Sequence, residues 1–103
     1  VSKSGRSLYS ATKFGLNGLT KSSALDLAKY NILVNSVSPG VIKTKLTKSI
    51  LNPNQLSKIK QEIPLKRLGD VSDVSSLVCF LCSDLNNYIT GQNFIIDGGY
   101  TAK

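Results

Sequence analysis

The amino-acid sequence predicts an α/β fold with parallel strands, and three observations support this. Residues 7–30 carry apolar side chains at three- and four-residue steps, which is typical of a helix. Residues 32–38 and 92–96 have the composition of short strands. A second helical pattern, over residues 70–83, lies between these two strands. Strands that alternate with helices favour a parallel sheet with helices on its faces.

The predicted helix over residues 7–30 contains two glycines, Gly15 and Gly18. Each is expected to destabilise a helix by roughly 1 kcal/mol relative to Ala. We therefore expect close packing on two sides of this helix, against its own sheet and against a partner subunit. Asn31 tolerates the left-handed conformation that commonly ends a helix. The apolar residues of the pattern are Leu8, Ala11, Leu16, Leu19, Leu25, Leu27 and Ala28.

The two predicted strands lack neighbours within this sequence. Residues 32–38 open with three consecutive apolar residues, which suits a sheet covered on both faces. Pro-Gly at 39–40 ends this strand, and Asp-Gly-Gly at 97–99 ends the strand over 92–96. Two strands are too few for an independent sheet. We therefore predict that residues 1–103 form a single partial domain.

The region between the strands is polar and rich in lysine. Within residues 41–64, the turn at Pro53 predicts one short helix over 54–63. Asp70 or Ser72 can cap the helix that follows and runs to about residue 83. Long connections of this kind are often lids or binding loops.

The charge balance is strongly positive, with 13 Lys and Arg against 6 Asp and Glu, a net charge of +7. Much of the excess lies between residues 43 and 67. This region is either a basic rim that attracts an anionic ligand or a solvated lysine-rich surface, and the second interpretation is favoured. Aromatic residues are not interleaved with the positive ones, so we predict no nucleic-acid partner. No apolar run is long enough to predict a membrane span.

Two further composition features bear on the class of protein. Cys79 and Cys82 lie inside an apolar helical pattern, and the sequence has no His, so we predict two buried free thiols and no metal site. Free thiols are typical of the reducing cytoplasm. The sequence contains no Met and starts at Val1, so we expect it to be a piece of a longer protein.

Tyr9 and Lys13 are four residues apart and therefore share one face of the predicted helix. A free phenol has a pKa near ~10, and a neighbouring ammonium group favours the phenolate and lowers that value. Such a pair can exchange a proton with a carbonyl or alcohol oxygen. The spacing alone is weakly specific, because tyrosine and lysine are common on solvated helix surfaces.

Four segments in sequence order make the pattern specific. They are residues 9–16 (YSATKFGL), 35–44 (NSVSPGVIKT), 67–74 (RLGDVSDV), and 88–92 (YITGQ) with 96–99 (IDGG). Together they resemble the C-terminal part of the short-chain dehydrogenase/reductase family, in particular its 3-oxoacyl-[acyl-carrier-protein] reductase-like enzymes. The resemblance implies the C-terminal portion of a Rossmann-like, doubly wound parallel sheet. It also implies an oxidoreductase that uses NAD or NADP and acts on a carbonyl or alcohol substrate, either a small molecule or one bound to an acyl carrier.

The same resemblance implies roles for individual residues. Tyr9 corresponds to the general acid/base, and Lys13 to the group that lowers the pKa of the tyrosine and hydrogen-bonds the nicotinamide ribose. The family commonly forms dimers or tetramers through this helix and its final strand, so a homodimer or homotetramer involving residues 7–30 and the final strand, over 92–96, is expected.

The segment after the first strand corresponds to the wall of the nicotinamide site. The resemblance implies that Pro39 and Gly40 shape this wall, that the backbone of Ile42 contacts the carboxamide, and that the Thr44 hydroxyl bonds the cofactor. A plain turn at 39–40 and a helix cap at Thr44 are the alternative roles. For Asn35 we expect a structural role, holding the neighbouring backbone.

Several family features are missing from the sequence. It contains no glycine-rich phosphate loop (G-x-x-x-G-x-G), which binds the pyrophosphate. The family's catalytic serine would fall before Val1. We therefore expect the 103-residue chain to be inactive by itself and to bind no NAD(P)H detectably. The alternative function is a non-catalytic relative that acts as an interaction or structural module. Neither the cofactor preference nor the substrate follows from these residues.

Overall fold

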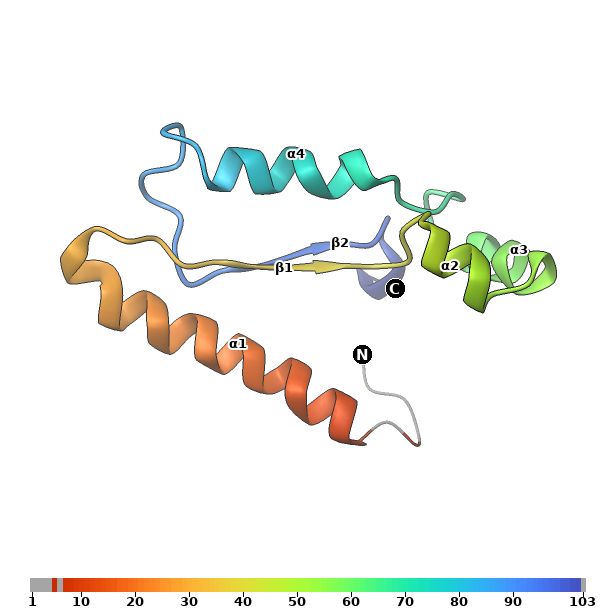
Figure 1. Cartoon of the computed structure of the whole chain (residues 1–103), viewed down its shortest axis with the longest axis horizontal. Coiled ribbons are helices and arrows are strands. Elements are labelled where there is room, and N and C mark those ends of the chain that lie inside the picture. Colours follow the sequence, from red (N-terminus) through yellow and green to blue (C-terminus); the bar gives the residue numbers. More distant parts are fainter. Residues whose placement is uncertain (1–4, 6, 103) are drawn as a thin grey trace.

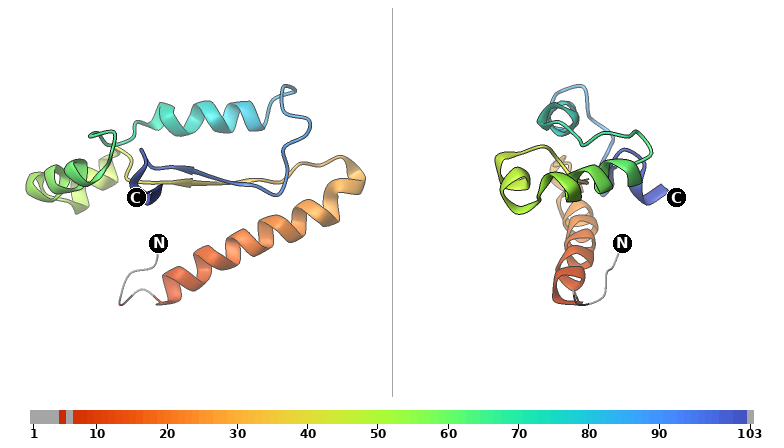
Figure 2. Two further views of the ribbon diagram at one scale, coloured as in Figure 1. Left: turned by 180° about the vertical axis from the view of Figure 1, so that it is seen from behind. Right: turned by 90° about the vertical axis from the view of Figure 1, so that its right-hand side faces the viewer.

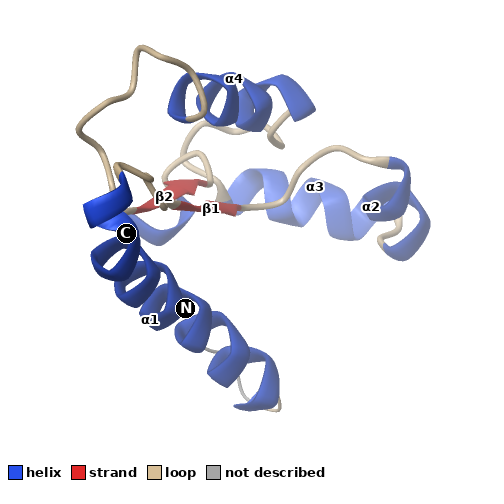
Figure 3. Cartoon of the chain, turned by 60° about the vertical axis from the view of Figure 1, so that its left-hand side comes forward, coloured by secondary structure: helices blue, strands red, loops and turns tan. Residues whose placement is uncertain are grey.

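The computed structural model describes Gly5 and residues 7–102. In chain order its elements are helix α1 (Ser7–Leu27), 3-10 helix η1 (Ala28–Tyr30), strand β1 (Ser36–Pro39), helices α2 (Lys45–Ile50), α3 (Pro53–Glu62) and α4 (Val71–Leu81), strand β2 (Asn93–Ile96) and 3-10 helix η2 (Tyr100–Ala102). Figure 3 shows this alternation of helices and strands, which the sequence predicted.

The described residues form three layers around a two-stranded sheet. β1 and β2 pair in parallel, with Ser36 opposite Asn93 and Pro39 opposite Ile96. α4 lies over one face of the sheet and α1 over the other (Figure 1). The end view in Figure 2 places these two helices on opposite sides. α2 and α3 extend beyond the carboxyl ends of the strands. Helices on both faces of a parallel sheet define a doubly wound arrangement.

β1 is shorter than the strand predicted over residues 32–38, because side chains replace part of the ladder. Before Ser36, the amide of Asn35 donates to the carbonyl of Ile89 at 2.8 Å. The side-chain oxygen of Asn35 accepts from the backbone N–H of Gln92 at 3.0 Å. The structural role expected for Asn35 is therefore confirmed. The Asn35 side chain links the start of β1 to the segment that precedes β2.

The long helix α1 forms as the periodicity predicts, but it packs less than expected. Its buried residues are Thr20 and Ala24, in its C-terminal half. An added Cβ at Gly15 or Gly18 meets no atom within 4 Å among the described residues. The expectation that the sheet of this chain packs closely against both glycines is therefore wrong. Asn31 follows η1 in the left-handed conformation (φ 57°), as predicted.

The connection over residues 41–64 contains two helices, whereas the sequence predicted one. Thr44 caps α2, accepting a hydrogen bond from the backbone N–H of Thr47 at 3.1 Å. α3 begins with a reciprocal capping box, in which Asn52 and Gln55 each accept from the backbone N–H of the other at 2.8 and 2.9 Å. α2 was missed because its six residues are too few to show an apolar period.

α4 starts at the predicted place but presents its cysteines differently. Asp70 occupies the cap position, and its backbone N–H donates to the Asp73 carboxylate at 2.7 Å. Cys79 and Cys82 are free thiols, as expected, but both are exposed, so the prediction of burial is wrong. The reason is that α4 packs on the sheet mainly along β1, and its other faces are not covered by the described residues.

The chain is more open than a compact domain of its size. Its radius of gyration is 15.8 Å, whereas a compact domain of this length has about 13 Å. Its accessible surface is 7789 Å², against about 5,700 Å² expected for a compact protein of this mass. Among the described residues no large side chain is fully buried, and long apolar side chains such as Leu8, Phe14 and Leu25 are mainly exposed. Much apolar surface therefore requires a covering partner or segment.

Backbone hydrogen bonds connect three segments of the chain where the strands end. We call residues 39–44, 63–69 and 96–99 the strand-end junction. The backbone N–H of Gly40 donates to Ile96 at 2.8 Å, and that of Lys43 donates to Gly69 at 2.8 Å. The third segment joins through the N–H of Leu65, which donates to Gly98 at 3.2 Å. These backbone hydrogen bonds thus hold together, at the carboxyl end of the two strands, three segments that are distant in sequence.

Candidate functional site

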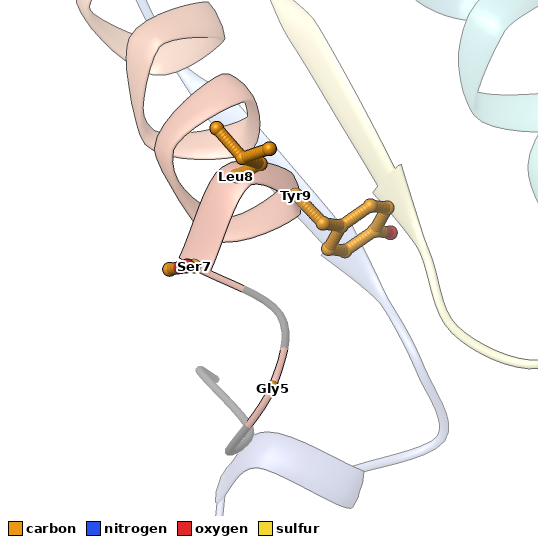
Figure 4. A pocket seen from close by; sticks show the side chains of 4 residues that line it. All are labelled: Gly5, Ser7, Leu8 and Tyr9. Carbon is orange, nitrogen blue, oxygen red and sulfur yellow. The ribbon is translucent and has the colours of Figure 1, made fainter.

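Tyr9 and Lys13 lie together at the start of α1. The ammonium nitrogen of Lys13 is 5.5 Å from the centre of the Tyr9 ring, within the range of a cation–π contact. The Tyr9 side chain is 57% exposed, and Figure 4 shows its ring projecting away from the helix. It borders a shallow cavity of about 270 Å³ that Gly5, Ser7 and Leu8 also line. The expected proximity of an ammonium to an accessible phenol is therefore present.

α1 runs antiparallel to the two strands, and this direction determines where the Tyr9–Lys13 pair lies. The first turn of the helix sits towards the carboxyl ends of β1 and β2 (Figures 1 and 2). Ligands of doubly wound sheets bind beyond the carboxyl ends of the strands. The other four candidate residues lie at this same end, from Pro39, the last residue of β1, to Thr44, which precedes α2. The structure therefore divides the six residues into two sets, one on α1 and one at the strand-end junction.

Pro39 and Gly40 mark the point where β1 leaves β2. Pro39 is the last residue of β1 and is exposed. A Cβ at Gly40 would lie 2.8 Å from the Cβ and 2.9 Å from the Cα of Asp97. Such distances leave no room for any side chain, so a glycine is required here for close backbone approach. β1 ends at Pro39, as predicted, but residues 39–40 do not form the plain turn considered from the sequence, because the Gly40 N–H still pairs with Ile96 at 2.8 Å. The end of β1 therefore lies against the segment that follows β2.

The backbone of Ile42 is turned away from its pairing partner. Ile42 forms a parallel bridge with Gly69, but the bonds of that bridge use the neighbouring Val41 carbonyl (3.0 Å) and Lys43 N–H (2.8 Å). The Ile42 carbonyl accepts from the Thr47 hydroxyl at 2.6 Å instead. In a parallel bridge, the N–H and carbonyl of the central residue point to the opposite edge. The N–H and carbonyl of Ile42 therefore face the edge opposite Gly69.

The hydroxyl of Thr44 caps helix α2, and its hydrogen bonds determine where its own proton points. It accepts from the Thr47 N–H at 3.1 Å and lies 3.0 Å from the Thr47 hydroxyl oxygen. Since the single Thr47 hydroxyl proton goes to Ile42, Thr44 must donate its own proton to Thr47. One acceptor position remains on the Thr44 oxygen. The capping role considered from the sequence is present, and a ligand N–H is what this oxygen can still accept.

The strand-end junction is also braced by a bidentate ion pair. The Arg67 guanidinium donates to the two Asp73 carboxylate oxygens at 2.6 and 3.1 Å. This hydrogen bonding, supported by the backbone N–H of Asp70, lowers the pKa of Asp73 to about 2. Asp97 behaves similarly, because the Thr101 hydroxyl and nearby backbone N–H groups lower its pKa. Both carboxylates hold backbone in place and are not positioned as proton donors at neutral pH.

A second cavity near this end was not recognised from the sequence. It has a volume of about 420 Å³ and lies between α2, α3 and the start of α4. Its wall includes Lys43, Lys48 and Lys60, three residues of the basic region between 43 and 67. The only signal in the sequence was the positive charge of that region, because α2 itself was not predicted.

The described residues show neither a membrane-spanning helix nor a metal centre. No described helix combines the length and apolar character needed to cross a bilayer. Over the same residues, Cys, Asp and Glu side chains do not gather in groups of three that could hold a metal ion.

Comparison with known proteins identifies the family. Residues 1–101 match the family described as enoyl-(acyl carrier protein) reductase. The 3-oxoacyl-[acyl-carrier-protein] reductase of Buchnera aphidicola subsp. Baizongia pistaciae is 46% identical over 99 residues, covering 96% of this chain and 40% of that protein. The chain thus spans about two-fifths of the length of the curated relatives it matches.

Solved structures agree with this result. A short-chain dehydrogenase family protein from Francisella tularensis superposes with a TM-score of 0.90 at 36% identity, over 100% of this chain and 47% of that one. A 4-hydroxyisoleucine dehydrogenase complexed with NADH gives a TM-score of 0.85 at 47% identity, over 92% of this chain and 40% of that one. The predicted resemblance and the Rossmann-like fold class are confirmed. The chain belongs to the short-chain dehydrogenase/reductase family.

Proposed function

We propose that this chain carries the proton-transfer pair and part of the nicotinamide site of an NAD- or NADP-dependent oxidoreductase. The reaction interconverts a carbonyl and an alcohol. The observation that carries the proposal is the Tyr9–Lys13 pair, 5.5 Å apart from ammonium to ring centre, at the end of the sheet where such folds bind ligands. A similar structure, the 4-hydroxyisoleucine dehydrogenase, holds NADH, which supports a nicotinamide cofactor here.

The role proposed for Tyr9 follows from proton balance. When bound, the nicotinamide supplies the hydride to the carbonyl carbon or takes it back. The Tyr9 hydroxyl donates its proton to the substrate oxygen during reduction and recovers it during oxidation. The Lys13 ammonium stabilises the negative charge that develops on the phenol oxygen. An accessible phenol at the rim of a cavity allows the substrate oxygen to approach it.

The residues at the strand-end junction supply one wall of the cofactor site in this proposal. Gly40 keeps the wall close to the sheet, and Pro39 lies exposed beside it. The Ile42 backbone faces the edge not used by Gly69. Thr44 accepts from the carboxamide N–H, because its own proton is directed to Thr47.

The test of this proposal is Tyr9→Phe in the full-length protein that contains this chain. We expect turnover to fall on the order of a hundredfold to ten-thousandfold, the usual contribution of general acid–base catalysis. Cofactor affinity, measured by fluorescence titration with NADH and NADPH, should remain unchanged. This separation is expected because the substitution removes only the hydroxyl group.

A matched control is available in the same helical region. In η1, Tyr30 is also exposed, and the Lys29 ammonium lies 5.1 Å from its ring centre. Tyr30→Phe should leave turnover within about twofold of the starting protein, because Tyr30 lies at the other end of the helix. Near-normal activity of Tyr9→Phe would contradict the acid/base assignment. An equal loss in both variants would point to a structural effect instead.

The substrate, assembly and location are also part of the proposal. The substrate is a small-molecule or acyl-carrier-bound carbonyl or alcohol, since relatives include an acyl-carrier-protein reductase.

Exposed Leu8, Phe14 and Leu25 on α1 support a homodimer or homotetramer. Light scattering of the full-length protein at micromolar concentration checks this, and a monomer would contradict it. The two free cysteines favour the cytoplasm.

A non-catalytic interaction module is the alternative function. The large exposed apolar surface is the observation that favours it. Measurable NAD(P)H oxidation by the full-length protein with any carbonyl substrate, lost in Tyr9→Phe, would exclude this alternative. Assembly without cofactor binding would support it.

A further inference from the structure

The cavity between α2, α3 and the start of α4 has a distinct charge. Its volume of about 420 Å³ lies within the range of small-molecule sites, and the proposed catalytic pair does not line it. Lys43, Lys48 and Lys60 come from three different segments and line the same cavity. Together they concentrate positive charge at a concave surface, where a field acts more strongly than on a convex one.

The remaining charges at this cavity are one guanidinium and two carboxylates, which together leave one negative charge against the three lysines. Arg67 also lines the cavity, but its guanidinium is held by both Asp73 oxygens at 2.6 and 3.1 Å. The lining carboxylate, Asp70, is 4.0 Å from the same guanidinium. The three lysines are therefore an excess of positive charge over the acidic groups at this wall. A multiply charged anion is the ligand class that such an excess favours.

The wall also has an apolar part, which constrains the ligand further. Leu56 and Leu68, the latter 9% exposed, also line the cavity, and Leu56 lies one helical turn before Lys60 on the same face of α3. The Ser57 hydroxyl is a further polar group of the lining. The Thr47 hydroxyl lines it too, but its proton is used by Ile42, so it donates nothing to an anion. A bare inorganic ion needs no apolar wall, whereas an ester of phosphate uses both surfaces.

We infer that this cavity binds the phosphate group of an organic phosphate monoester, whose uncharged body lies against Leu56 and Leu68. Lys43, Lys48 and Lys60 hold the phosphate as flexible point charges with three donors each. The inference is independent of hydride transfer, because it concerns binding alone. A basic surface that is merely solvated would lack this arrangement of charge beside an apolar wall.

The test compares charge removal inside and outside the cavity. Lys48→Gln and Lys60→Gln remove lining ammonium groups, whereas Lys45→Gln and Lys58→Gln remove charges from the same two helices outside the lining. Phenyl phosphate binding to the full-length protein is measured by calorimetry. Each lining variant should weaken binding at least about fivefold, the effect of losing the attraction between two unit charges ~4 Å apart in water. The two outer variants should change it less than about twofold, because exposed charges beyond the site are screened.

The outcomes separate the possible ligands. Phenyl phosphate should bind more tightly than inorganic phosphate, and Leu56→Ser should remove this preference while retaining the binding of inorganic phosphate. Equal affinity for the two probes would overturn the organic part of the inference. Equal losses of phenyl phosphate binding in all four lysine variants would show a diffuse basic surface. A DNA duplex that binds more tightly than phenyl phosphate and loses affinity equally in all four variants would show the same. No binding of either probe at millimolar concentration would also overturn it. Circular dichroism of each variant checks that α2 and α3 remain folded.

Discussion

The first turn of helix α1 and the strand-end junction lie at the same end of the molecule, but the helix and the junction are stabilised in different ways. α1 has 21 residues, yet its buried residues are Thr20 and Ala24. The strand-end junction joins three segments through backbone bonds such as Gly40 to Ile96 at 2.8 Å. There, glycines are required because added atoms would overlap neighbours, whereas on α1 the space around Gly15 is open.

This difference shows which part of the site depends on the rest of the protein. A helix of this length can form from its own periodicity, but most helix stability comes from tertiary packing. The Tyr9–Lys13 pair therefore sits on an element that needs a covering surface. The nicotinamide wall, in contrast, sits on backbone that this chain already holds. The two halves of the proposed site should respond differently to substitution.

The largest effect is expected at the strand-end junction. Gly98 has a φ of +65°, and a Cβ there would lie 2.7 Å from Cγ2 of buried Ile63. Gly98→Ala should lower the free energy of unfolding of the full-length protein by about 3 kcal/mol, from backbone strain and overpacking together. Urea unfolding measures it. Gly91→Ala is the control, since its φ is +72° but the nearest atom is 3.5 Å away, and about 1 kcal/mol is expected. Equal losses would mean that packing contributes nothing.

A smaller loss is expected where the junction leads into α2. Thr44→Ala removes the cap of this short helix and should lower the free energy of unfolding by about 1 kcal/mol. Thr44→Ser keeps the hydroxyl and should behave like the starting protein. If Thr44 also accepts from the carboxamide, the KM for cofactor should rise in Thr44→Ala only. An unchanged KM in both variants would leave Thr44 as a cap alone.

The opposite sign is expected on α1. Gly15→Ala adds a methyl group to open space and should stabilise the protein by roughly 0.5–1 kcal/mol, because alanine favours the helix over glycine. Thermal unfolding of the full-length protein checks the sign. A destabilised variant would show instead that a partner or another segment packs on the backbone at this position, as the sequence first led us to expect.

The smallest effect is expected on the loss of folding stability at low pH. Asp73 has a folded-state pKa of about 2, below its usual 3.8, so its contribution to stability is present above pH ~4 and is lost as the pH falls towards 2. The effect should be small because the ion pair is largely exposed. In unfolding measured between pH 5 and 2, Asp73→Asn should flatten the decline. Asp26→Asn, which removes a carboxylate from α1, is the control, and equal flattening by both variants would contradict the assignment to the Arg67–Asp73 pair.

The elements of this protein follow largely from local sequence. The step of apolar residues predicts α1, Asn31 ends it, and Asp70 marks the start of α4. These predictions succeed because capping and helical periodicity depend on residues within one or two turns. The family resemblance was equally local, since it rests on short segments that keep their order along the chain.

Only the tertiary structure decided burial, pairing and the second cavity. Cys79 and Cys82 lie in an apolar pattern but are exposed, because burial depends on which surfaces meet. β1 begins at Ser36 because the Asn35 side chain takes over the preceding pairing. Lys43, Lys48 and Lys60 line one cavity because α2 and α3 fold back towards the segment before α4. The sequence therefore determined what each segment is, and long-range contacts determined what each segment faces.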